Sequence, residues 1–318
     1  EALGKLAEPV AATTLATPLL KDPEVPVRVE AAIAVHRCRQ LLRARNPAAT
    51  VPPLADDTLA ALRGLAADAD AAARRAAIYY FARNLDKRAL DLAQSLVRDS
   101  DGEVRLFAVM ALRRIGDAAA SPALQTAAAD PDYTVRVAAV QALDGLKLAE
   151  LIAPGLLADP SIHVRAAVAT AYGNSGKVDE QQLVRLWTTD PSAMVRASAL
   201  TALATRRKAG AEALLIQAAA DKNAEIRATA MSSAGVLGVT GAEAAALLQR
   251  GLTDATGRVR VAALEQLGDV SSQWAYAAIK AALVAPTLAE RGTAASVLGA
   301  RQELDRAQVA WQAYGDSL

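Results

Sequence analysis

Small and aliphatic side chains recur along the chain at fixed distances from a series of arginines. The residue before each arginine is aliphatic in seven cases and alanine in the eighth, the third residue after it is alanine or once valine, and the seventh is again apolar. Offsets of −1, +3 and +7 lie along one side of a helix. The pattern therefore predicts a helix at each arginine, with this apolar side buried.

An aspartate precedes each of these arginines by six residues, and the pair occurs eight times. Successive arginines are separated by 46, 31, 31, 29, 31, 31 and 33 residues. Repetition at this period is typical of stacked helical repeats, and it overrides the two domains that length alone suggests. The pairs are Asp22/Arg28, Asp68/Arg74, Asp99/Arg105, Asp130/Arg136, Asp159/Arg165, Asp190/Arg196, Asp221/Arg227 and Asp254/Arg260.

Residues between the arginine helices predict a second helix in each repeat. An apolar stretch such as residues 89–97 leads to each following aspartate. Proline follows four of the aspartates, which suits a first helical turn, and we expect the aspartate itself to cap that helix. Gly116, Gly176 and Gly238 lie 11 residues after their arginines, where a left-handed residue would end the helix. No segment shows the alternation of a strand.

The recurring pattern, clearest in residues 130–143, resembles HEAT repeats, and its short period resembles the compact bacterial variety found in phycobilisome lyases. The resemblance implies an all-α, right-handed superhelical solenoid of helix-turn-helix units. We expect a single solenoid over residues 1–318, with a partial repeat at 1–21, eight repeats at 22–284 and an insertion near 43–57. Residues 285–318 would form a degenerate last repeat or cap, with Trp311 and Tyr314 covering its end. The partial repeat favours a chain that continues upstream.

Composition narrows the chemistry. The chain has 318 residues with 35 basic and 34 acidic side chains, 53% hydrophobic and 3% aromatic residues, and 79 alanines. A chain this apolar can fold, and its net charge of +1 lacks the basic excess of a dedicated nucleic-acid binder. One cysteine and two histidines predict neither a metal site nor a cofactor. No apolar run reaches the length of a membrane span, so we expect a soluble protein of the bacterial cytoplasm or periplasm.

The Asp–Arg column is interpreted as a structural ladder between repeats, because an active site would break the symmetry of the repeat. The ladder would comprise Asp99, Arg105, Asp130, Arg136, Asp159, Arg165, Asp190, Arg196, Asp221 and Arg227. His36 and Cys38 are two residues apart on a predicted helix and point in different directions, which is unsuited to a metal or thiol site. Basic clusters at 37–45, 113–114 and 206–208 fall at different places in the repeat, unlike the continuous basic track of HEAT-like DNA glycosylases.

A polar column on the second helix is the candidate for partner binding. Five residues before the aspartates, mostly polar side chains stand among apolar neighbours. The resemblance implies that this helix lines a concave groove, where we expect a protein or peptide partner. Trp187, close by, is expected in the core. The candidate residues are Arg63, Gln94, Gln125, Arg185 and Gln249.

No nucleophile, acid–base pair or phosphate-binding loop emerges, so the predicted function is a non-catalytic protein-interaction scaffold. Two alternatives stay open. The chain could be an accessory region of a larger enzyme, such as a cyclophilin-type peptidyl-prolyl isomerase, with the catalytic domain outside it. It could also be a phycobilin lyase-like subunit, since the resemblance includes such lyases. Deoxyhypusine hydroxylase, which has a similar architecture, needs His-Glu pairs that this sequence lacks.

Overall fold

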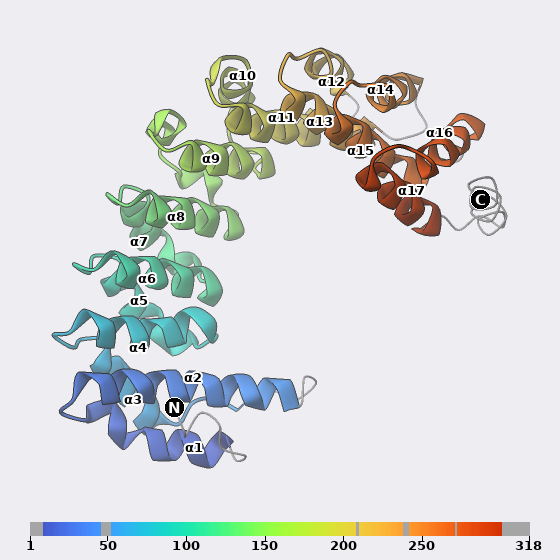
Figure 1. Ribbon diagram of the computed structural model, residues 1–318. Helices are drawn as coiled ribbons and strands as arrows, with labels where there is room; N and C mark the ends of the chain where they lie inside the picture. The colour runs from blue at the N-terminus through green and yellow to red at the C-terminus, as the bar shows by residue number, and fades with distance from the viewer. Residues whose placement is uncertain (1–8, 46–51, 208–209, 238–241, 271, 301–318) are drawn as a thin grey trace. The chain divides into compact units, whose positions relative to one another are not determined.

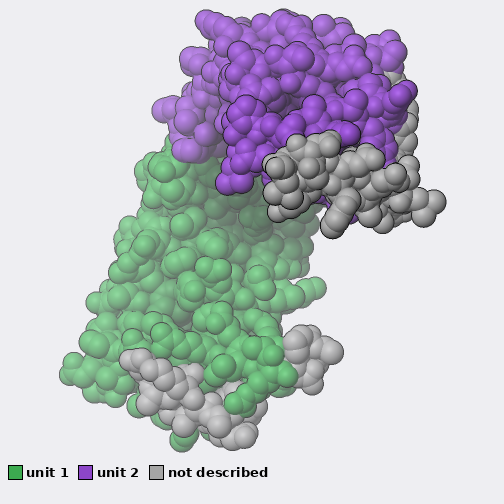
Figure 2. Space-filling model, turned by 45° about the vertical axis from the view of Figure 1, so that its right-hand side comes forward, with its two compact units in different colours: residues 1–156 green, residues 157–318 purple. Residues whose placement is uncertain are grey.

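A computed structural model describes residues 9–45, 52–207, 210–237, 242–270 and 272–300. These residues form stacked helices and no strand (Figure 1), so the fold is the predicted all-α solenoid. The chain separates into two compact units, residues 1–156 and 157–318 (Figure 2). The division of residues 1–318 into a single solenoid of numbered repeats stays a prediction.

In unit 1 the arginine helices α2, α4, α6 and α8 contact one another in order and form one layer (Figure 1). Shorter helices lie behind them, some preceded by a turn of 3₁₀ helix. The α-helices are α1 (Pro9–Ala16), α2 (Val25–Arg45), α3 (Asp56–Leu65), α4 (Ala71–Arg83), α5 (Leu90–Leu96), α6 (Gly102–Ile115), α7 (Ser121–Ala127) and α8 (Tyr133–Gly145). The 3₁₀ segments are η2 (Pro18–Lys21), η3 (Lys87–Ala89), η4 (Ala118–Ala120), η5 (Ala149–Leu151) and η6 (Pro154–Ala158).

Unit 2 repeats this arrangement, with α9, α11, α13, α15 and α17 contacting one another in order. Its α-helices are α9 (Ile162–Asn174), α10 (Glu180–Thr189), α11 (Ala193–Arg207), α12 (Glu212–Ala218), α13 (Ala224–Ser232), α14 (Ala242–Leu252), α15 (Gly257–Glu265), α16 (Gln273–Leu283) and α17 (Leu288–Ala300). The 3₁₀ segments η8 (Ala234–Leu237) and η9 (Gln266–Asp269) follow α13 and α15.

Each short helix packs against the arginine helix that follows it, as α5 does with α6 and α10 with α11. The aspartate turn holds the two helices together. In one such turn Arg105 donates from Nη1 to the carbonyl oxygens of Asp99 (3.0 Å) and Ser100 (3.2 Å), which lie just before its own helix. The natural structural pair is therefore short helix, aspartate turn, arginine helix.

The apolar stripe forms the core of each unit. Val104, Ala108 and Leu112 of α6, at offsets −1, +3 and +7, are each fully buried. The equivalent residues of the other seven arginine helices are also buried, except for the half-buried Val27. Small side chains at the middle position leave little bulk between helices, which is why an alanine-rich chain can pack closely.

The aspartate of each repeat is not the N-cap that the sequence predicts. Helix α8 begins at Tyr133, and its cap is Asp132, whose side chain accepts a hydrogen bond from the Thr134 amide (2.8 Å). Asp130 lies two residues before this cap, and its carboxylate accepts a hydrogen bond from the Asp132 amide (2.8 Å). This bond shapes the turn that leads into the cap. The same two-step arrangement precedes α4, α6 and α13.

The predicted helix ends are correct in one of the two described cases. Gly116 ends α6 in the left-handed conformation, with φ of 71°. Helix α9 ends at Asn174 with the extended residue Ser175, so Gly176 does not terminate it. Gly238, residues 46–51 of the insertion, the first eight residues, and Trp311 and Tyr314 lie outside the described residues.

Candidate interaction surface

The arginines and aspartates of the repeat form hydrogen-bonded ion pairs between neighbouring repeats. Arg105 donates from Nε and Nη2 to the two carboxylate oxygens of Asp130, at 2.6 and 2.9 Å. Both side chains are largely buried, at 14% and 4% exposed. The same pairing joins Arg28 to Asp68, Arg74 to Asp99, Arg165 to Asp190 and Arg227 to Asp254. These charges are used inside the stack and are unavailable to a ligand.

Two positions of this ladder depart from the regular pairing. Arg196 donates to the Asp190 carbonyl (3.1 Å), but no ion pair joins it to Asp221, both residues being within the described part of the chain. In the last described repeat, where alanine replaces the aspartate, Glu290 of α17 accepts from Arg260 Nε at 2.7 Å. The other predicted ladder residues form hydrogen bonds within the aspartate turns. Arg136 donates to the Asp130 carbonyl, and the Asp159 and Asp221 carboxylates accept from the amides of residues 161 and 223.

The polar column of the short helices lies at the surface, and three of its five candidate residues bond to the next repeat. Arg63 donates to the Arg88 carbonyl (2.7 Å), Gln94 to the Ala119 carbonyl (2.7 Å) and Gln125 to the Leu151 carbonyl (3.3 Å). Arg63 also pairs with Asp91 of α5. Gln125, Arg185 and Gln249 are exposed, whereas Arg63 and Gln94 are half-buried. The role of this column in partner binding stays a prediction, and Trp187 lies in the core as expected.

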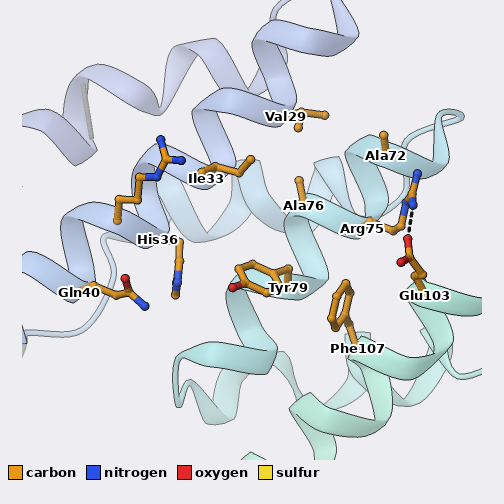
Figure 3. Close-up of a pocket in the computed structure, with 11 residues that line it drawn as sticks. Val29, Ile33, His36, Gln40, Ala72, Arg75, Ala76, Tyr79, Glu103 and Phe107 are labelled. Carbon is orange, nitrogen blue, oxygen red and sulfur yellow. Dashed lines mark hydrogen bonds and ion pairs between the residues drawn. The ribbon is translucent and has the colours of Figure 1, made fainter. Parts of the chain in front are cut away.

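A groove of about 560 Å³ crosses the open face of α2, α4 and α6, on the layer formed by the arginine helices (Figure 3). Apolar side chains from all three helices line it, and polar ones stand at its edges. Arg75 and Glu103 close one side by pairing with each other. The lining residues, here called the α2–α4–α6 groove, are Val29, Ile33, His36, Arg37, Gln40, Ala72, Arg75, Ala76, Tyr79, Glu103 and Phe107.

Three rings from three helices meet edge to face in this groove. The ring centroids of His36 and Tyr79 are 5.2 Å apart, and those of Tyr79 and Phe107 are 5.3 Å apart, with interplanar angles of 74° and 73°. The Arg83 guanidinium lies 5.3 Å from the Tyr79 ring centroid, a cation–π contact. Tyr79 and Phe107 are only half-buried, so an apolar ligand group could reach them.

His36 is a neutral member of this cluster. Asn84 Nδ2 donates to its Nδ1 (3.0 Å) and to the Tyr80 carbonyl (2.8 Å), which leaves the proton of the neutral ring on Nε2. Burial, together with the charges of Arg83, Arg43 and Arg37, lowers the pKa of His36 below its usual 6.5. Cys38 faces away into the core, where burial raises the pKa of its thiol. A buried, protonated thiol is a poor nucleophile.

The sequence interpretation missed this groove, although one signal was present. In a chain with 3% aromatic residues, Tyr79, Tyr80 and Phe81 stand in succession, and Phe107 lies on the next arginine helix. Tyr80 and Phe81 occupy the core, whereas Tyr79 and Phe107 face the groove. Tyr79 and Phe107 follow their ladder arginines by five and two residues, so they lie one turn apart on the same side of successive helices. Aromatic residues on that side, outside the buried stripe, indicate a surface for binding.

Within the described residues, no group of three His, Cys, Asp or Glu side chains is placed to hold a metal ion. Nor does any described helix combine the length and apolar character needed to cross a membrane.

The comparisons with known proteins agree with the fold. A family model for HEAT repeats matches residues 57–144 and 180–260, more than half of the chain. No curated protein matches the chain. Among solved structures, YibA from Escherichia coli has 18% identity and a TM-score of 0.53, over 84% of this chain and 94% of YibA. A chain of a Kap95:Nup1 complex has 13% identity and a TM-score of 0.67, over 92% of this chain and 45% of that one.

A chain from a structure of Kap95p with RanGDP is similar at 11% identity and a TM-score of 0.56, over 91% of this chain and 44% of that one. At these identities the structural likeness speaks for the fold alone. The family match, the repeated Asp–Arg frame and the paired helices of both units lead to one conclusion: the chain belongs to the HEAT repeat family.

Proposed function

We propose that this chain is a non-catalytic scaffold that binds a protein or peptide partner on the surface of its repeats. The observation that carries the proposal is the α2–α4–α6 groove, where half-buried aromatic rings lie at the surface of a repeat whose own core is already filled. Only the Asp–Arg pairs and the apolar stripe recur from repeat to repeat. The side chains that differ between repeats are therefore available to select a partner.

The structural comparisons support the same function by analogy. Two of the similar structures are described as complexes of Kap95 with another protein, Nup1 or RanGDP. The shared property is the stack of helical pairs, which offers a long surface with little internal rearrangement. The analogy extends to binding as a class of function and to no particular partner.

Two surfaces compete as the place of binding. The polar column on the short helices has Arg63 and Gln94 engaged with the following repeat, and binding through them would cost those bonds. The groove holds apolar and aromatic groups whose burial by a partner would be favourable. We therefore place the partner in the groove, with Arg185 and Gln249 of the column as the rival position.

Site-specific photo-crosslinking in the native source tests both the function and its location. A photoreactive residue replaces Gln40, at the edge of the groove, or Arg185, on the column; both side chains are exposed. We expect one protein to cross-link at position 40 in the full chain. The same protein cross-linked only at position 185 would move the site to the column. No protein enriched over an unirradiated sample at either position would contradict the scaffold function.

A further inference from the structure

Three arginines occupy the same register of the successive helices that line the groove. Arg37, Arg83 and Arg114 each follow the ladder arginine of their helix by nine residues, on α2, α4 and α6. All three side chains are exposed. Within the described residues none of them forms an ion pair, in contrast to the ladder arginines. We call them the arginine row.

The arginine row belongs to unit 1 and is not a property of the repeat. The equivalent residue is Gly145 in α8, Asn174 in α9 and Thr205 in α11. Three unpaired cations side by side repel one another, so the free protein gains nothing from the row. Charges that the scaffold does not use are available for an anionic partner.

Two arginines of the row, Arg37 and Arg83, adjoin the aromatic cluster. Arg37 also lines the groove, and Arg83 lies over the Tyr79 ring. The positive charges of Arg83 and Arg37 contribute to the lowered pKa of His36, whose ring lines the groove. Glu103 is the one acidic lining residue, and Arg75 neutralises it. A ligand would therefore meet an apolar floor with uncompensated positive charge along one edge.

The spacing of the row fits an extended chain that crosses the helices. Packed helices lie about 8–10 Å apart, and a polyproline II peptide advances about 9 Å in three residues, with every third side chain on the same face. Acidic side chains three residues apart would thus meet successive arginines. An apolar side chain between them would face the rings of Tyr79 and Phe107.

Resting on the proposed function, we propose that the partner presents an acidic, extended segment with carboxylates at every third residue and an apolar residue between them. The carboxylates bind the arginine row, and the apolar side chain enters the cluster of His36, Tyr79 and Phe107. Bidentate pairing with guanidinium groups orients the carboxylates, and burial of the apolar group adds affinity.

The ring geometry favours a peptide over a single-stranded nucleic acid. Bases bind to proteins by stacking flat on exposed aromatic faces. Here Tyr79 meets both neighbouring rings edge to face, and Arg83 lies over it as well. The cluster therefore presents narrow slots, which suit a branched side chain better than a planar base.

Fluorescence anisotropy with the full chain tests the inference. The probe is a labelled nine-residue peptide in which glutamate, proline and leucine repeat three times. One control peptide has the same composition with its three glutamates placed together, and the other has lysine in place of each glutamate. We expect saturable binding of the probe that weakens with added salt, and affinity about tenfold lower for each control.

Charge reversal identifies the residues. Arg83→Glu should weaken binding of the probe by about tenfold, and the combined Arg37→Glu, Arg83→Glu and Arg114→Glu variant should abolish it and gain binding of the lysine peptide. Arg250→Glu, at an exposed arginine of unit 2 that belongs to neither candidate surface, is the matched control and should leave affinity unchanged. Circular dichroism checks that each variant is folded, and the gain for the lysine peptide cannot come from unfolding.

Three results would overturn the inference: no saturable binding of the probe, equal affinity for the clustered-glutamate peptide, or full affinity in the triple variant. Tighter binding of a labelled uridine oligonucleotide than of the probe would assign the surface to nucleic acid instead. The scaffold function is judged separately. A cross-linked partner that still binds the triple variant would keep the function and remove the acidic-peptide inference.

Discussion

Gly173 shows how closely the helices of unit 2 approach at a single residue. A Cβ atom at this position of α9 would lie 2.8 Å from Ala202 Cα in α11 and closer still to its Cβ. Because one of these atoms is backbone, the helices would have to separate. We expect Gly173→Ala to lower the free energy of unfolding by about 1–3 kcal/mol, the usual cost of overpacking, as measured by urea denaturation.

Gly145 of α8 supplies the matched control, because no atom lies within 4 Å of where its Cβ would be. Alanine there removes backbone freedom from the unfolded chain and meets no neighbour at this exposed position, so Gly145→Ala should stabilise by about 0.5–1 kcal/mol. If both substitutions changed stability in the same direction, the close approach of α9 and α11 would not be a constraint on the sequence.

At the scale of helices, the ladder contains its own internal control. Arg165 and Arg196 both donate to the carbonyl of the aspartate in their own turn, at 2.8 and 3.1 Å. Arg165 also pairs with Asp190 of the next repeat, whereas Arg196 has no such pair with Asp221 within the described residues. We expect Arg165→Ala to cost about 2–3 kcal/mol more than Arg196→Ala, since it leaves a buried carboxylate without its cation.

Chemical denaturation of both variants measures this difference, and probe-peptide affinity measures its effect on function. Arg165 belongs to unit 2 and the groove residues belong to unit 1, so affinity for the acidic peptide should stay unchanged. Equal losses of stability in the two variants would mean that the arginine stabilises the fold through its contacts within the turn and not through its pair with the next repeat.

The sequence predicts these elements well where the interaction is local and periodic. Residues at offsets −1, +3 and +7 share a helix side whatever the rest of the chain does, so the buried stripe follows from spacing alone. The N-cap was misplaced by two residues because aspartate is equally suited to a turn and to a cap. In the fourth repeat Asp130 and Asp132 satisfy both roles, and composition cannot order them.

At the scale of the whole chain, the groove was harder to predict than the fold. Its lining comes from three helices, and His36, Tyr79 and Phe107 gain meaning only when those helices lie side by side. The basic clusters start at different places in the repeat, which suggested scattered surface charge. Register resolves this, since Arg37 and Arg114 fall at the same offset as the isolated Arg83. Alignment on the ladder arginine would have revealed the row.

Titration across the chain predicts how its stability depends on pH. Hydrogen bonds from Arg227 lower the pKa of Asp254 below 3.8, and the Asp70 amide and Arg28 do the same for Asp68. For such groups the unfolded chain binds more protons than the folded chain as the pH falls towards and below 3.8. Stability contributed by these pairs is therefore complete above about pH 5 and is lost on acidification through the lowered pKa values.

His36 adds an earlier step to this loss. Burial lowers its pKa below 6.5, so between 6.5 and the folded pKa the unfolded chain holds a proton that the folded chain lacks. Stability should thus begin to fall below about pH 6.5 and fall again below about pH 4. Urea denaturation at a series of pH values measures both steps. His36→Leu should remove the first step alone and Asp254→Asn should reduce the second alone, whereas stability that rises on acidification would contradict both assignments.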